Sequence, residues 1–239
     1  MNGININGPK IIFKIPILGG IPVTETVINA WIIMAIIFFT ALWLAHDLKK
    51  KNPTKRQIVA EKLVTMLYDL VDQTMGKKGR SFAPYIGTLF VFSLLSSLSS
   101  MFGLRAPTAD YNTTLAWALI TFFLVQYQGI KNKGVGGWLH AFIEPMPLLM
   151  PLNVVGEIAN PISLSFRHYG NIAAGLVITT LLYGGLAALT SIIFGGLQIP
   201  ILQLGLPAIL SIYFDVFTSG LQAFIFCMLT MVFISNNFE

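Results

Sequence analysis

Five long stretches of this sequence carry few or no charged residues, and they restrict the possible fold more than any other feature. The first, from Val27 to Ala45, is 19 residues long and has no charge. About 20 apolar residues in a helix span the hydrocarbon core of a bilayer, which is about 30 Å thick. Charged residues make up 10% of the chain, against about 25% in a typical soluble domain. The sequence therefore predicts an all-α integral membrane protein.

The predicted architecture has about five membrane-embedded helices, the last two long and tilted, and one amphipathic surface helix. Residues 1–26 form an extracytoplasmic segment, and 27–239 form a single transmembrane domain. The embedded segments are 27–46, 84–104, 114–130, 145–194 and 200–235. The run from Pro200 to Ile234 has 35 residues and would measure about 52 Å as a helix. Because that exceeds the bilayer thickness, this helix is tilted or broken.

Residues 55–75 have a different pattern, with apolar side chains such as Val59, Leu63 and Leu70 at helical spacing and charged residues on the other face. This pattern is typical of an amphipathic helix on the membrane surface or against a partner. A short soluble helix packed on a loop is the alternative.

The positive charges predict the orientation. Of the 15 Lys and Arg residues, nine lie between Lys49 and Arg80, and Lys131 and Lys133 bring the group to eleven. Basic residues collect on the cytoplasmic side of membrane proteins. We therefore expect the amino terminus outside and the carboxyl terminus in the cytoplasm. The net charge of +5 is too scattered to indicate nucleic-acid binding.

Arg167 is the most unusual residue, because it lies inside a long apolar stretch. A charge at the centre of a membrane costs about 2.5–3.5 kcal/mol on insertion scales. A chain that carries this cost has a use for the charge. The alternative is a purely structural arginine in an internal ion pair with Glu157 or Asp215.

Two polar stripes surround this arginine on the predicted helices. On one helix, one face holds residues at spacings of three and four, namely Glu157, Asn160, Leu164, Arg167 and Asn171, and Ser163 and His168 flank this stripe. On the last helix, Asp215, Ser219 and Gln222 share a face. Polar stripes inside lipid usually line water-filled ion paths. Interhelical hydrogen bonding is the alternative for Ser219 and Asn171 taken singly.

Four sequence motifs in order resemble those of subunit a of the F-type ATP synthases. They are PTADYNTTLAWAL, KGVGGW, NPISLSFRHYGNI and LQAFIFCMLTMVFIS, and the resemblance covers residues 27–235. It implies an ion-translocating stator subunit, without catalytic activity of its own, that carries protons or sodium ions. The implied partners are the ring of c subunits, the peripheral stalk subunit b and membrane lipid, and the implied location is a bacterial plasma membrane.

The resemblance also implies roles for individual residues. Arg167 takes the position of the arginine that faces the ring carboxylates, and Asn171 and Gln222 match family positions near it. Asp215 falls where the family keeps an ionisable group in the outer half-channel. Leu176 departs from the pattern, because many members have an acid or a histidine there. His168 is either an extra polar group of the inner path or a packed ring.

Two other classes of function are alternatives. A secondary transporter or cation channel could use Arg167 to bind an anionic substrate, although no internal repeat is evident. A membrane enzyme would need catalytic groups that converge, and the sequence has no metal-ligand, nucleophile-elbow or phosphate-loop motif. We therefore expect no cofactor and no metal.

Overall fold

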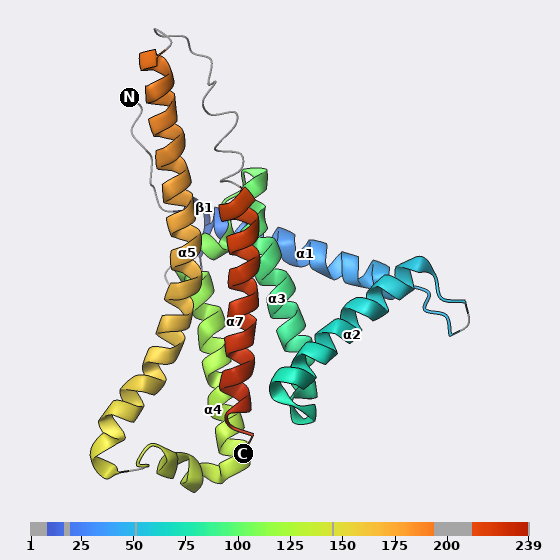
Figure 1. Ribbon diagram of the computed structural model, residues 1–239, viewed down its shortest axis with the longest axis vertical. Coiled ribbons are helices and arrows are strands. Elements are labelled where there is room, and N and C mark those ends of the chain that lie inside the picture. The colour runs from blue at the N-terminus through green and yellow to red at the C-terminus, as the bar shows by residue number, and fades with distance from the viewer. Residues whose placement is uncertain (1–8, 17–19, 51, 145, 194–211, 239) are drawn as a thin grey trace.

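The chain is built almost entirely from helices. The computed structural model describes residues 9–16, 20–50, 52–144, 146–193 and 212–238, and Figure 1 shows their arrangement. The α-helices are α1 (Glu25–Ala45), α2 (Lys55–Met75), α3 (Ala83–Leu98), α4 (Tyr111–Ala141), α5 (Met150–Ile193) and α7 (Thr218–Ser235). Within these described ranges, five helical segments are long and apolar enough to cross a membrane. The predicted all-α integral membrane class is thereby confirmed.

Several helix bounds differ from the predicted segments. The third extends well beyond 114–130, because α4 continues to Ala141 past a bend at Gly134, where φ is 70° and ψ is 168°. α5 is a single helix of 44 residues with Pro161 inside it. Of the last predicted segment, 200–211 lie outside the described residues. A π-helical turn, η6 (Ile212–Phe217), leads into α7.

Local signals explain where the polar helix α2 and the long helix α4 begin and end. The Thr54 hydroxyl accepts a hydrogen bond from the backbone amide of Gln57 and caps α2, and Gly76, at φ 67°, ends this helix. The Asp110 carboxylate accepts a hydrogen bond from the backbone amide of Asn112 at the start of α4. Side-chain oxygens at such positions satisfy amide groups that the helix itself leaves unpaired. Glycine favours the positive φ at a helix end because it has no Cβ.

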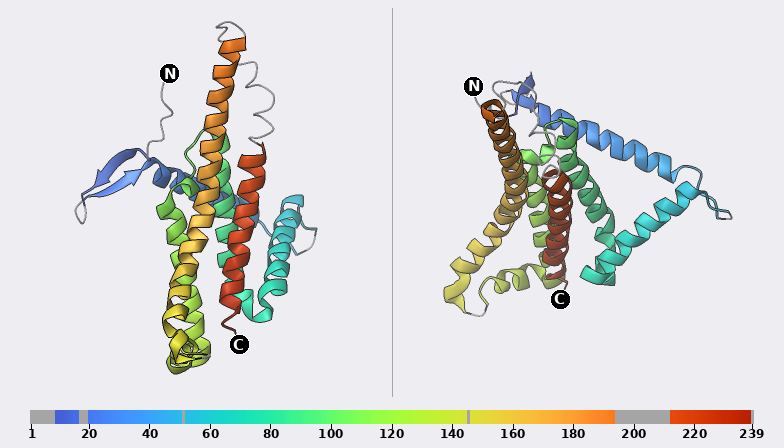
Figure 2. Two further views of the ribbon diagram at one scale, coloured as in Figure 1. Left: turned by 60° about the vertical axis from the view of Figure 1, so that its left-hand side comes forward. Right: turned by 45° about the horizontal axis from the view of Figure 1, so that its top comes forward.

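The core lies where α3, α4, α5 and α7 meet, with the end of α2 against them. Ile86, Phe226 and Met231 are buried there. Ser93, Ser96 and other small residues of α3 are also buried, and small residues let helices approach closely in lipid. Figure 2 shows α5 and α7 as neighbours in both of its views.

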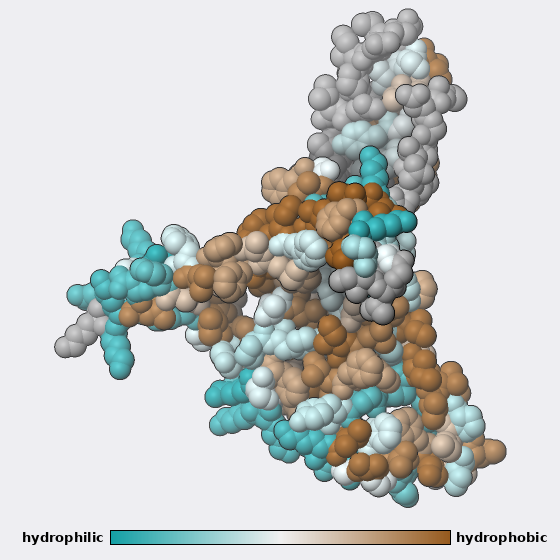
Figure 3. All heavy atoms as spheres, turned by 180° about the vertical axis from the view of Figure 1, so that it is seen from behind, coloured by the Kyte–Doolittle hydropathy of each residue, from teal (hydrophilic) through white to brown (hydrophobic). Residues whose placement is uncertain are grey.

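The amino-terminal region extends away from this core. β1 (Ile11–Ile15) pairs antiparallel with β2 (Ile21–Thr24), a hairpin that the sequence pattern did not predict. α1 then leaves the bundle and α2 returns to it (Figures 1 and 2). Trp31, Phe39 and Trp43 of α1 are exposed. Brown, apolar side chains cover much of the surface in Figure 3, as expected for helices in contact with lipid.

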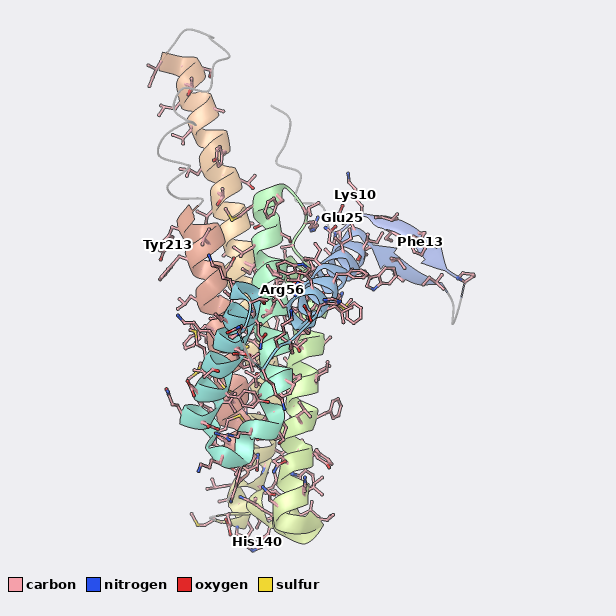
Figure 4. The ribbon with its side chains drawn as sticks, turned by 90° about the vertical axis from the view of Figure 1, so that its right-hand side faces the viewer. Lys10, Phe13, Glu25, Arg56, His140 and Tyr213 are labelled. Atoms are coloured by element: carbon pink, nitrogen blue, oxygen red, sulfur yellow. The ribbon has the colours of Figure 1, made fainter. Side chains whose placement is uncertain are left out.

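Polar contacts mark two levels along the long axis of the molecule. At the end that holds the carboxyl terminus, Lys78 Nζ donates to the backbone oxygen of Phe238 over 3.2 Å, and the Asn132 side-chain amide donates to Asn237. At the level of the start of α1, Arg105 pairs with Glu25 at 3.6 Å. Figure 4 places Glu25 and His140 far apart along the long axis. The carboxyl terminus and the α4–α5 turn therefore share one end, and the start of α1 lies toward the other.

Candidate functional site

Arg167 lies on the exposed face of α5. Its exposed neighbours on this helix include Asn160, Ser163 and Asn171. Among the side chains that the structure describes, Arg167 makes no hydrogen bond or ion pair, and Glu157 bonds to Gln126 instead. The side chain of Asp215 lies outside the described residues, as does that of Leu176. The predicted alternative of an internal Arg167–Glu157 pair is therefore wrong.

The opposite face of α5 is packed into the core. His168 is 1% exposed and Leu164 is 3% exposed. The His168 Nε2 atom lies 3.3 Å from the Ser93 hydroxyl, and the ring makes edge contacts with Trp117 and Phe226. The structure thus places His168 as a packed ring that joins α5 to three other helices. It does not share the exposed face of Arg167.

An open cavity of about 530 Å³ lies between α4, the first half of α5 and the end of α7. Its polar lining includes Gln126, Asn153, Glu157, Asn160, Asn236 and Asn237. It reaches along α5 as far as Leu164. Arg167 comes three residues later, which is about 4.5 Å further along a helix. A polar cavity thus leads from the end that holds the carboxyl terminus toward the arginine.

Glu157 is the acid in this cavity, and two residues that the sequence-based reasoning missed hold it. The Gln126 side-chain amide donates to Glu157 Oε1, and Trp138 Nε1 donates to Gln126 Oε1 over 2.8 Å. The sequence held one signal for Gln126, namely its place as a polar residue near the end of an apolar segment. Trp138 ends the KGVGGW motif, but the sequence does not place it beside Gln126, because its position depends on the bend at Gly134.

The polar residues of α7 have a different environment from Arg167. Ser219 is 1% exposed and Gln222 is 5% exposed, so both face the interior of the bundle. Asp215 belongs to the π-helical turn before α7. The structure therefore brings Glu157 and Asn160 to one cavity and exposes Ser163, Arg167 and Asn171. It buries His168, Ser219 and Gln222.

Comparison with known proteins identifies the family. The family model of the ATP synthase A chain matches residues 27–235. ATP synthase subunit a of Moorella thermoacetica is 37% identical over 92% of this chain and 93% of that protein. The sodium ion specific ATP synthase subunit a of Propionigenium modestum is 34% identical over 97% of this chain and 86% of that protein. This membrane protein, with an exposed arginine on a long apolar helix, therefore belongs to the ATP synthase subunit a family.

Proposed function

We propose that this chain is the ion-translocating stator subunit of a rotary F-type ATP synthase. Two half-channels carry protons or sodium ions to and from the carboxylates of a c-subunit ring, and ion flow turns the ring. Rotation drives ATP synthesis in a separate catalytic head, so this chain has no catalytic site of its own. Subunit b of the peripheral stalk holds it against the ring.

The observation that carries this proposal is Arg167, which is exposed on an apolar helix and has no partner among the described side chains. A guanidinium stays protonated in proteins, whereas a buried lysine can lose its charge. At about 4 Å and an effective dielectric of about 20, a carboxylate gains about 4 kcal/mol from such a charge. That energy favours the ionised carboxylate about a thousandfold. An arriving ring carboxylate would therefore release its ion beside Arg167.

The polar cavity beside α5 serves as the inner half-channel in this proposal. Its lining provides one carboxylate, Glu157, and several amide groups such as that of Asn160. Carboxylate and amide oxygens can carry a proton through bound water or replace part of the hydration shell of a cation. Because the cavity ends one helical turn before Arg167, ions from the inside would meet the ring there. The fixed positive charge would stop them from crossing directly to the outer path.

The outer half-channel is assigned to Asp215, Ser219 and Gln222 of the last helix. The sequence brings these residues to one face at spacings of four and three. In this proposal Asp215 exchanges ions with the outside, and Gln222 lies beside the path near Arg167. Asn171 and Ser163 line the exposed face of α5 next to the ring.

We further propose a bacterial plasma membrane location with the carboxyl terminus in the cytoplasm. Lys131 and Lys133 lie near the end that holds the carboxyl terminus, where Asn132 contacts Asn237. Lys78 also lies at this end. Arg105 lies far from this end, beside Glu25 at the start of α1. Basic residues collect on the cytoplasmic side, which supports this orientation.

Replacement of Arg167 by alanine tests the proposal in the complete ATP synthase. ATP-driven ion pumping into vesicles should fall to background, while the c ring still purifies with this chain in mild detergent. Full pumping by the variant would refute the proposal. A transporter of anionic substrates would purify without a ring of small hairpin proteins, so the same preparation separates these two functions.

A further inference from the structure

We infer that Trp138 and Gln126 are positioning residues, which fix the direction of the Glu157 carboxylate in the inner cavity. The inference deepens the proposed function and depends on it, because it concerns the same inner path. Neither residue needs to touch the ion. Trp138 acts on Gln126, and Gln126 acts on Glu157.

The donor and acceptor groups of the three side chains determine how the Gln126 amide must be oriented. The indole N–H of tryptophan can only donate, so the oxygen of the Gln126 amide must face Trp138, at 2.8 Å. The NH₂ group of the same amide must then face Glu157, whose Oε1 atom accepts at 2.5 Å. With the amide reversed, its oxygen would face the carboxylate, and two acceptors would repel each other. Trp138 therefore selects the one orientation of Gln126 that can bind Glu157.

The backbone between Gln126 and Trp138 bends so that the indole lies against the preceding part of α4. Gly134 has φ 70° and ψ 168°, values that residues with a Cβ rarely adopt. The chain turns there, and Trp138 packs edge-on against Phe142 with ring centroids 5.1 Å apart. A Cβ on Gly129 would lie 3.1 Å from Trp138 Cδ1. Gly129 thus leaves the space that the indole occupies.

The consequence for the inner path is a carboxylate with one oxygen held and the other directed elsewhere. Glu157 Oε1 is bound by Gln126, and Glu157 lines the cavity. Within the described residues, Oε2 has no hydrogen-bond partner. Because the carboxylate is already held in one orientation, less conformational entropy is lost when an ion or a bound water engages its second oxygen. Removal of the indole N–H should let the amide reverse and the carboxylate turn away.

The test measures ATP-driven ion pumping by the complete enzyme in vesicles, with Trp138→Phe, Glu157→Gln and the double variant. Trp138→Phe keeps an aromatic ring against Phe142 and removes only the donor. Loss of one orienting hydrogen bond should lower pumping about three- to tenfold. Because the indole acts through the carboxylate, Trp138→Phe should have no further effect when Glu157→Gln is already present. A role in packing alone would instead give additive effects.

The control is Trp31→Phe, the same chemical change at an exposed position of α1, which should leave pumping unchanged. Gln126→Glu is the second variant: it can still accept from the indole but has no NH₂ group for Glu157, and pumping should fall at least as much. The inference is overturned if Glu157→Gln lowers pumping but Trp138→Phe and Gln126→Glu do not, or if the effects add. If Glu157→Gln itself has no effect, the inner path of the proposed function is wrong as well.

Discussion

Arginines in two regions of this chain differ in what surrounds them. At the connection between α3 and α4, Arg105 pairs with Glu25 at 3.6 Å, and its backbone oxygen accepts from the Asn29 side chain. In the middle of α5, Arg167 is exposed and has no partner among the described side chains. The first arginine attaches α1 to the bundle. The second carries a charge on a helix of mainly apolar residues, and in the proposed function its partner is a carboxylate of the c ring.

The largest expected difference comes from the same substitution at both arginines. Arg167→Lys should lower ATP-driven pumping at least about tenfold, because a lysine in a low-dielectric site can lose its charge and presents fewer donors. Arg105→Lys should leave the rate within about twofold, since lysine can still pair with Glu25. Pumping rates of the two variants in vesicles make the measurement. Equal losses of pumping rate in both variants would show that the two arginines do not differ in their roles.

A smaller effect is expected from Asp215→Asn. In the proposed function Asp215 belongs to the outer path, so ATP synthesis driven by ions from the outside should slow several-fold while the subunit still assembles with the ring. If Asp215 were instead the permanent partner of Arg167, its loss would leave an uncompensated buried charge and impair assembly. An unchanged synthesis rate would exclude Asp215 from the path.

The smallest effect concerns a third arginine, at the end of α2. Arg80 Nε donates to Asp72 over 2.8 Å, and this hydrogen bond lowers the pKa of Asp72 below its ordinary value of 3.8. A lowered folded-state pKa stabilises the fold above the unfolded-state pKa, about 3.9, and the contribution is lost as pH falls through the folded-state pKa. The melting temperature of Asp72→Asn in detergent should therefore lie slightly below that of the unmodified protein at about pH 5.

The difference should disappear as the pH falls through the lowered folded-state pKa of Asp72. Asp69→Asn, three residues earlier on the same helix, is the control and should show a smaller difference, since its carboxylate makes no hydrogen bond among the described residues. A difference that stays constant over the whole acid titration would mean that the Asp72 carboxylate has no electrostatic role.

The membrane helices were largely predictable because their signals are local. The length of a run without charges shows directly whether a helix can span the membrane. The pattern of 55–75 predicted the polar helix that the structure has as α2. The hairpin of Ile11–Thr24 was missed, because strands of five and four residues beside Pro and Gly give little signal. The bend of α4 lies at Gly134 in the KGVGGW motif, but the sequence could not show that the bend brings Trp138 to Gln126.

For the candidate site, the sequence indicated which residues to consider but not their geometry. Arg167 stood out because a charge in an apolar run is costly. Its neighbour His168 was placed beside the same stripe, yet consecutive residues on a helix point about 100° apart. The two side chains therefore point in different directions, and periodicity alone does not say which of them faces the core. The packing of Trp117 and Phe226 around the His168 ring decides it.

The central claim is that the Arg167 face of α5 lies against the ring, and disulfide cross-linking tests it most directly. Ser163 is exposed on this face, and Ser165, two residues later, is fully buried on the other side. Each is replaced by cysteine in a complete enzyme whose c subunits carry a cysteine near the membrane carboxylate. The account predicts a cross-link to the ring from position 163 and none from position 165. A ring cross-link from position 165, or none from position 163, would contradict it.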